Sequence, residues 1–213
     1  VSSGTNQVLR YDATGAFTGG FIGNPGNPIF PNGIIVPKDI VFDAAGRAYV
    51  SSSINHRVLR FPAAGGTVGV VVAAAFGDVA APFPGSTINL PHGLLFGPDR
   101  NADTFADLYV ASEGGSEILI FSGNPALPAF LGALVNNASG FLSGPTFMTI
   151  GPNDSLWVSS RGGGSVLRFG LYDGDFRGEI VPSTRGGVAG PHGLLLEPSR
   201  LLVVSQDTHQ ILA

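Results

Sequence analysis

Short bursts of apolar residues, separated by turns rich in glycine and proline, recur along the chain in a fixed order. Each copy opens with a proline and a nearly continuous apolar stretch. It then turns into a strand ending in valine and serine, and turns again into a strand resembling Val-Leu-Arg-Phe. The copies begin at Pro37, Pro91, Pro145 and Pro191. Short strands repeated at intervals of roughly 50 residues, with no helical segments between them, indicate a β-propeller.

The spacing inside a copy is nearly constant. The valine of the second strand follows the opening proline by 13 positions at Val50, Val158 and Val204, but by 19 at Val110, so that one copy carries a six-residue insertion. The position before this valine holds Tyr49, Tyr109 and Trp157, and Val203 is expected there in the last copy. Bulky residues at this position are expected to pack between neighbouring blades.

The pattern predicts an all-β fold with four-stranded antiparallel blades, five of them visible in full or in part, in a ring of five to six. We expect residues 1–213 to form a single propeller domain. The blades are expected near residues 1–36 (partial), 37–90, 91–144, 145–190 and 191–213 (partial). A fourth, variable strand is expected near Phe17–Ile22, Val68–Phe76, Phe130–Val135 and Phe176–Val181. The stretch Gly23–Ile35 is expected to be a long loop.

The two ends of the chain carry the same segment. Residues 1–10 align without a gap on residues 204–213, so the second and third strands occur five times and the leading strand four times. The ends therefore do not complete one another in a single-chain closure. Unpaired strand edges favour pairing with a partner, so we expect self-association or contact with another protein chain through unpaired blade edges.

Composition narrows the functional classes. Only 12% of the residues are charged and the net charge is −4, so no basic surface is expected for nucleic acid. No apolar run is long enough to span a membrane. There are no cysteines, which excludes disulfides and thiolate metal sites. The charge-poor surface, rich in Ser, Thr, Asn and Gly, favours an extracellular or cell-surface location.

The repeat resembles the NHL-type propellers, including secreted bacterial members and the streptogramin-lyase group. The motifs that carry the resemblance are Pro-[His/Lys/Thr]-Gly-Leu, Gly-Pro-Asp, Leu-Tyr-Val-x-Ser and Val-Leu-Arg-Phe, and they cover essentially the whole chain. The resemblance is specific for the fold, whereas one propeller fold hosts many functions.

The insertion contains a candidate calcium loop. Asp99, Asn101, Asp103 and Asp107 stand at positions 1, 3, 5 and 9, and a backbone carbonyl near Phe105 would add a further oxygen. Calcium takes six to eight oxygen ligands, often from such alternating positions. The loop resembles the calcium loops of FG-GAP-type propeller repeats, from which it departs by having Thr104 where glycine is usual. The alternative is an acidic surface turn.

A second candidate site consists of two histidines in Pro-His-Gly-Leu motifs. His92 and His192 occupy the same repeat position, just before the innermost strand, so both are expected at one end of the central channel. This arrangement resembles the peptidylglycine-amidating lyase domain, whose channel zinc is held by histidines of Pro-His motifs. A catalytic zinc site usually has three protein ligands, and only two such histidines are present. The alternative is a pair of rim histidines bonded to backbone or water.

No complete catalytic set is visible in the sequence. We therefore expect a secreted or cell-surface propeller that acts as a binding or structural module, able to self-assemble and stabilised by a calcium loop, rather than an enzyme. The alternatives are a metal-dependent lyase at the channel mouth, with zinc on His92 and His192, and a propeller that binds carbohydrate or peptide.

Overall fold

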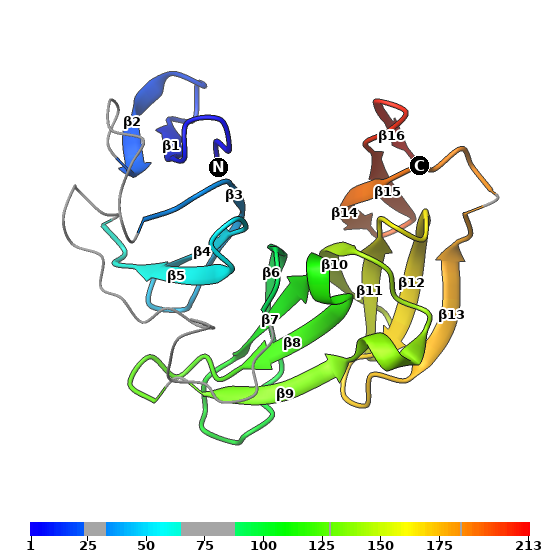
Figure 1. The fold of residues 1–213 in the computed structure, drawn as a ribbon. Helices are drawn as coiled ribbons and strands as arrows, with labels where there is room; N and C mark the ends of the chain where they lie inside the picture. Colours follow the sequence, from blue (N-terminus) through cyan, green and yellow to red (C-terminus); the bar gives the residue numbers. More distant parts are fainter. Residues whose placement is uncertain (24–32, 65–87, 128, 184) are drawn as a thin grey trace.

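Every strand among the described residues belongs to an antiparallel sheet, and the sheets follow one another around an arc (Figure 1). The computed structural model describes residues 1–23, 33–64, 88–127, 129–183 and 185–213. Within these residues it contains five sheets, which we call blades one to five. Figure 1 shows the arc open, with blade one and blade five at its two ends. The all-β fold and the antiparallel, propeller-like blades are confirmed.

The strands of each blade are consecutive in the chain. Blade one contains β1 (Val8–Tyr11) and β2 (Phe17–Ile22), and blade two contains β3 (Pro37–Phe42), β4 (Ala48–Ser52) and β5 (Arg57–Phe61). Blade three contains β6 (Pro91–Gly97), β7 (Asp107–Ser112), β8 (Glu117–Phe121) and β9 (Phe130–Val135). Blade four contains β10 (Pro145–Gly151), β11 (Ser155–Ser160), β12 (Ser165–Gly170) and β13 (Phe176–Val181). Blade five contains β14 (Pro191–Glu197), β15 (Arg200–Ser205) and β16 (Gln210–Leu212). Single turns of 3-10 helix lie at Glu113–Gly115 and Asn137–Ser139.

Blades three and four have the four strands expected from the repeat. Three of the predicted fourth strands are present as β2, β9 and β13. The fourth, Val68–Phe76, lies outside the described residues, as does most of the loop Gly23–Ile35. The strands of the five sheets lie within residues 8–22, 37–61, 91–135, 145–181 and 191–212.

The register of the last copy differs from the prediction by one residue. Tyr49, Tyr109 and Trp157 each pair with the fifth residue of the inner strand, counted from its proline. In blade five the corresponding residue, Leu195, pairs with Leu202 and not with Val203. The turn between β14 and β15 is one residue shorter than those of blades two and four, so counting from the proline misassigns the strand. Val203 instead faces the preceding blade, in the core with Val166.

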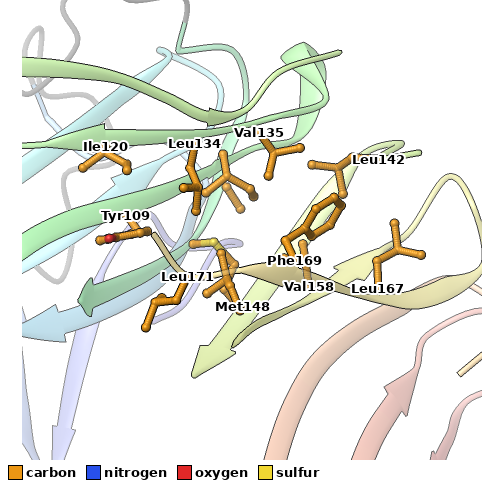
Figure 2. Packing of buried hydrophobic residues seen from close by; sticks show 13 residues of the cluster. Tyr109, Ile120, Leu134, Val135, Leu142, Met148, Val158, Leu167, Phe169 and Leu171 are labelled. Atoms are coloured by element: carbon orange, nitrogen blue, oxygen red, sulfur yellow. The ribbon is translucent and has the colours of Figure 1, made fainter. Parts of the chain in front are cut away.

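The hydrophobic core lies between blades rather than within one sheet. Side chains alternate along a strand, so each blade has one face toward the preceding blade and one toward the following blade. Figure 2 shows the cluster between blades three and four, where Tyr109 and Ile120 meet Met148, Phe169 and other buried residues. Similar clusters join blades one to two, two to three and four to five. The fold therefore depends on each blade having a neighbour.

The first strands of blades two to five line the axis of the arc and contact one another in chain order. A close approach occurs at Gly93, where an added Cβ would lie 2.8 Å from the carbonyl oxygen of Thr146. Only glycine permits this approach, which explains the residue after the histidine in Pro-His-Gly-Leu. None of the described residues belongs to a helix long and apolar enough to cross a membrane.

Candidate functional site

The two predicted histidines meet at one end of the axis. His92 is the second residue of β6 and His192 the second residue of β14, and their ring centroids are 5.4 Å apart. Between these strands lies β10, whose Thr146 hydroxyl donates to the Pro191 carbonyl at 2.9 Å. The structure thus brings these two histidines together from blades three and five, on either side of blade four. We call this end of the axis the channel mouth.

Two charged residues that the sequence analysis did not identify complete the cluster. The His92 Nε2 atom lies 2.9 Å from a Glu113 carboxylate oxygen, and Arg161 Nη1 lies 3.2 Å from the other oxygen of the same carboxylate. Glu113 follows the last serine of β7, and Arg161 follows the last serine of β11. They occupy the same repeat position in adjacent blades with opposite charges. An alignment of that position would have revealed them.

The cluster is largely removed from water. The His92 side chain is 6% exposed, that of Glu113 18% and that of Arg161 41%. The hydrogen bond from His92, together with Arg161, lowers the pKa of Glu113 to about 2, against the opposing effect of burial. Glu113 is therefore an anion held between two donors.

His192 favours its uncharged form, in contrast with the anionic Glu113. The pKa of His192 is lowered, first by burial and then by the electrostatic effect of the neighbouring His92, Lys38 and Arg161. Near neutral pH it is an uncharged imidazole that can accept a hydrogen bond, a proton or a metal ion. The Nδ1 atom of His92 is buried and has no hydrogen-bond partner among the described residues. Buried polar atoms are usually paired, so an unpaired one is a candidate contact for a ligand.

A half-buried carboxylate, Asp39, lies beside this cluster in blade two. Asp39 accepts hydrogen bonds from its neighbour Ile40 at 2.8 Å and from Leu94 of β6 at 2.8 Å. Burial raises its pKa. The bond to Leu94 holds β3 and β6 together beside His92, so Asp39 is a positioning group for the inner strands.

The candidate calcium loop lies at the opposite end of the strands, between β6 and β7. Asp99 accepts hydrogen bonds from the amides of Asp103 and Thr104, at 3.3 and 2.8 Å. Asp103 accepts from the Phe105 amide and from the Ser122 hydroxyl. Asn101 also donates to Asp103. The structure thus gathers Asp99, Asn101 and Asp103 into one turn, with these carboxylates bonded to the loop's own backbone.

Asp107 closes the loop from inside the fold. It is completely buried, and its Oδ2 atom accepts from the Arg100 amide at 2.7 Å. Its Oδ1 atom has no partner among the described residues. Burial, followed by the negative charges of Asp99 and Asp103, raises the pKa of Asp107. A nearby cation would relieve both effects.

Neither candidate forms a complete metal centre in this arrangement. Across the described ranges, no three His, Asp or Glu side chains converge closely enough to hold a metal ion. Calcium at the loop would require the carboxylates to exchange backbone hydrogen bonds for the ion. Zinc at the channel mouth would have two histidine ligands and would need a third.

No protein-family model matches the chain, and no curated protein matches it. Solved structures do. A streptogramin B lyase is 15% identical, with a TM-score of 0.62, over 99% of this chain and 62% of that protein. A catalytically inactive virginiamycin B lyase from Staphylococcus aureus, solved with quinupristin, is 17% identical, with a TM-score of 0.62, over 98% and 59%. A gluconolactonase from Xanthomonas campestris is 19% identical, with a TM-score of 0.63, over 94% and 63%.

Likeness at these identities extends to the fold alone. The chain spans about three fifths of the length of these proteins. It is thus an all-β propeller with the fold of the streptogramin-lyase and gluconolactonase propellers, as its NHL-type repeat implied.

Proposed function

We propose that this chain is a binding propeller, secreted or displayed at the cell surface, that recognises its ligand at the channel mouth. The observation that supports this proposal is the cluster of His92, Glu113, Arg161 and His192, which converges from three blades. The contact between His92 and Glu113 is largely buried, and replacing buried charged contacts by apolar side chains is often neutral or stabilising, so stability alone gives little reason to keep them. Titratable groups with perturbed pKa values cluster at functional sites.

Arrays of carbohydrates and of peptides, probed with the labelled chain, test this proposal. Ligands that bind are expected to shift the NMR signals of the His92 and His192 imidazoles. Glu113→Gln and His192→Ala are expected to weaken binding at least tenfold, since a lost hydrogen bond to a charged group is worth about 1.5–3 kcal/mol. Gln206→Ala, at the exposed equivalent of Glu113 in blade five, is the matched control. Binding that survives both site substitutions would count against the channel mouth.

A metal-dependent lyase at the same site is the second candidate. The observation that favours it is the neutral His192 lying 5.4 Å, ring to ring, from His92, which is itself bonded to the Glu113 carboxylate, an arrangement suited to proton transfer or metal ligation. Zinc would be held by His92 and His192. The structural neighbours that are lyases make quinupristin the natural probe. Stoichiometric zinc by elemental analysis and consumption of quinupristin, both lost in His192→Ala, would establish this function, whereas a zinc-free, inert chain would eliminate it.

We also infer a calcium-stabilised loop at residues 99–107. The fully buried Asp107, with one unpaired oxygen, supports it. EDTA is expected to lower the melting temperature, and added calcium to restore it. Asp103→Ala is expected to abolish that sensitivity. A melting curve that is unchanged by EDTA would contradict the inference.

A further inference from the structure

The chain contains a single lysine, Lys38, and the fold places it at the channel mouth. Lys38 is the second residue of β3, the position that His92, Thr146 and His192 occupy in the inner strands of the next three blades. These inner strands contact one another in chain order, so the four side chains lie at the same end of the axis. Lys38 contributes, after burial and His92, to the lowered pKa of His192, which places it near that ring.

The Lys38 ammonium has no partner among the described residues. No hydrogen bond or ion pair joins it to any of them, although the residue is half-buried. The carboxylate of its neighbour Asp39 is bonded elsewhere: one oxygen accepts from the Ile40 amide and the other from the Leu94 amide, both at 2.8 Å. Buried charges are paired as a rule, so this ammonium is a candidate contact for an anion.

The second carboxylate at the channel mouth is occupied as well. Glu113 lies 2.9 Å from His92 Nε2 and 3.2 Å from Arg161 Nη1. After burial, which is the largest cause, His92, Lys38 and Arg161 lower the pKa of His192, and Glu113 raises it by less than any of the three. The surroundings of His192 are therefore electropositive, and they favour an anionic group on the ligand.

The imidazole of His192 requires a second feature of the ligand. Because the ring is uncharged near neutral pH, one of its nitrogens is an acceptor. No hydrogen bond of this ring is found within the described ranges. A hydroxyl group donates to such a nitrogen, whereas a carboxylate only accepts. A ligand with a carboxylate near Lys38 and a hydroxyl near His192 satisfies both groups.

We propose that the channel mouth binds an acidic carbohydrate, whose carboxylate pairs with the Lys38 ammonium and whose hydroxyl donates to His192. This inference rests on the proposed binding function and adds the class of the ligand. A sugar acid carries both groups on one ring. An acidic peptide built from glutamate offers the carboxylate without the hydroxyl, so the two kinds of ligand are distinguishable.

The single lysine allows a direct test by NMR. Reductive methylation with isotope-labelled formaldehyde labels Lys38 and the amino terminus and keeps their positive charge, and Lys38→Arg identifies the lysine signal by its absence. The probe is trigalacturonate, with its methyl ester as the neutral counterpart. Trigalacturonate is expected to shift the Lys38 methyl signals, and the ester to leave them in place. Triglutamate is expected to bind at least tenfold more weakly than trigalacturonate.

Substitutions then separate recognition from a general effect of charge. Lys38→Gln is expected to weaken trigalacturonate binding at least tenfold in titration calorimetry, whereas Lys38→Arg keeps the charge and most of the affinity. Arg168→Gln removes one positive charge at an exposed position of β12 and is the control. It should change the affinity less than twofold.

Three results would each overturn the inference: trigalacturonate that binds no more tightly than its ester, triglutamate that binds equally well, or Lys38→Gln that behaves as Arg168→Gln does. A neutral ligand whose binding is lost in Glu113→Gln and His192→Ala would also overturn it, while upholding the channel mouth as a binding site. The class of the ligand and the binding function itself can therefore fail separately.

Discussion

At the scale of single residues, backbone conformation and burial decide what the loop and the channel mouth tolerate. Thr104 of the calcium loop has a φ of 73°, in the left-handed region. Side chains branched at Cβ are strained there, and glycine is not. The sequence identified Thr104 as the departure from the usual calcium loop, and the structure shows that the turn adopts the glycine-like conformation nevertheless.

Thr104→Gly is therefore expected to stabilise the chain by about 0.5–1 kcal/mol, since Thr104 is exposed and loses no packing. Urea unfolding in EDTA measures this effect apart from any bound ion. Ala13→Gly, in an exposed turn that is not left-handed, is the control and should lower stability. A loss of stability in Thr104→Gly would show that the threonine makes a stabilising contact.

Glu113 gives the channel mouth a pH dependence. Its folded pKa of about 2 lies below the ordinary 4.5. A lowered carboxyl pKa contributes stability above the unfolded value, and this contribution is lost as the pH falls from 4.5 toward 2. The pKa of His192 is also lowered in the folded chain. As the pH falls below the ordinary histidine pKa of about 6.5, the imidazole of the unfolded chain binds a proton more readily than that of the folded chain, so His192 destabilises the fold in acid.

Glu113→Gln is expected to cost roughly 1–3 kcal/mol near pH 7, because it removes the charge that His92 and Arg161 face. The difference from the unmodified chain should shrink as the pH is lowered toward about 2. Urea unfolding across this range, with the exposed Glu179→Gln as control, measures it. If the difference in free energy of unfolding between the variant and the unmodified chain stays constant with pH, the charge of Glu113 does not contribute to stability.

At the scale of the blade, the serine that ends each second strand is a structural device. In blade four the Ser160 hydroxyl accepts from the Ser143 amide at 3.0 Å and donates to the Ser143 carbonyl at 3.0 Å. Ser112 and Ser205 make the same pair of bonds with Asn89 and Ala189. The repeated serine thus anchors the segment that leads into the inner strand of its own blade.

Ser160→Ala is expected to destabilise the chain by about 1–2 kcal/mol, because it removes two hydrogen bonds, leaving the Ser143 amide without this partner and the Ser143 carbonyl with the Gly162 amide alone. Ser199→Ala, at an exposed turn, is the control and should change stability by less than about 0.5 kcal/mol. Thermal and urea unfolding give both values. Equal losses of stability in Ser160→Ala and Ser199→Ala would contradict a structural role for Ser160.

At the scale of the whole molecule, the contribution of a repeat position to stability depends on which blades surround it. Phe169 lies in the core between blades three and four, whereas Tyr11, at the same repeat position, is 55% exposed on blade one. The two residues share local sequence and strand position. They differ in having or lacking a preceding blade.

Phe169→Ala is expected to cost about 3–5 kcal/mol, as for other buried aromatics, and Tyr11→Ala less than about 1 kcal/mol. Urea unfolding of the two variants tests this contrast. A large loss in Tyr11→Ala would indicate that its face is covered in solution.

The repeat by itself determined the all-β class, the order of strands in each blade and the common location of His92 and His192, because these follow from local periodicity and from equivalent positions. It did not determine the register of the last blade, where a one-residue shorter turn places Leu202, and not Val203, opposite Leu195. Nor did it reveal the partnership of Glu113 and Arg161, which requires two adjacent blades to bring opposite charges together across 48 residues. Only the packing of blade on blade decided which copies of a repeated side chain are core and which, like Ile211 and Tyr11, stand exposed.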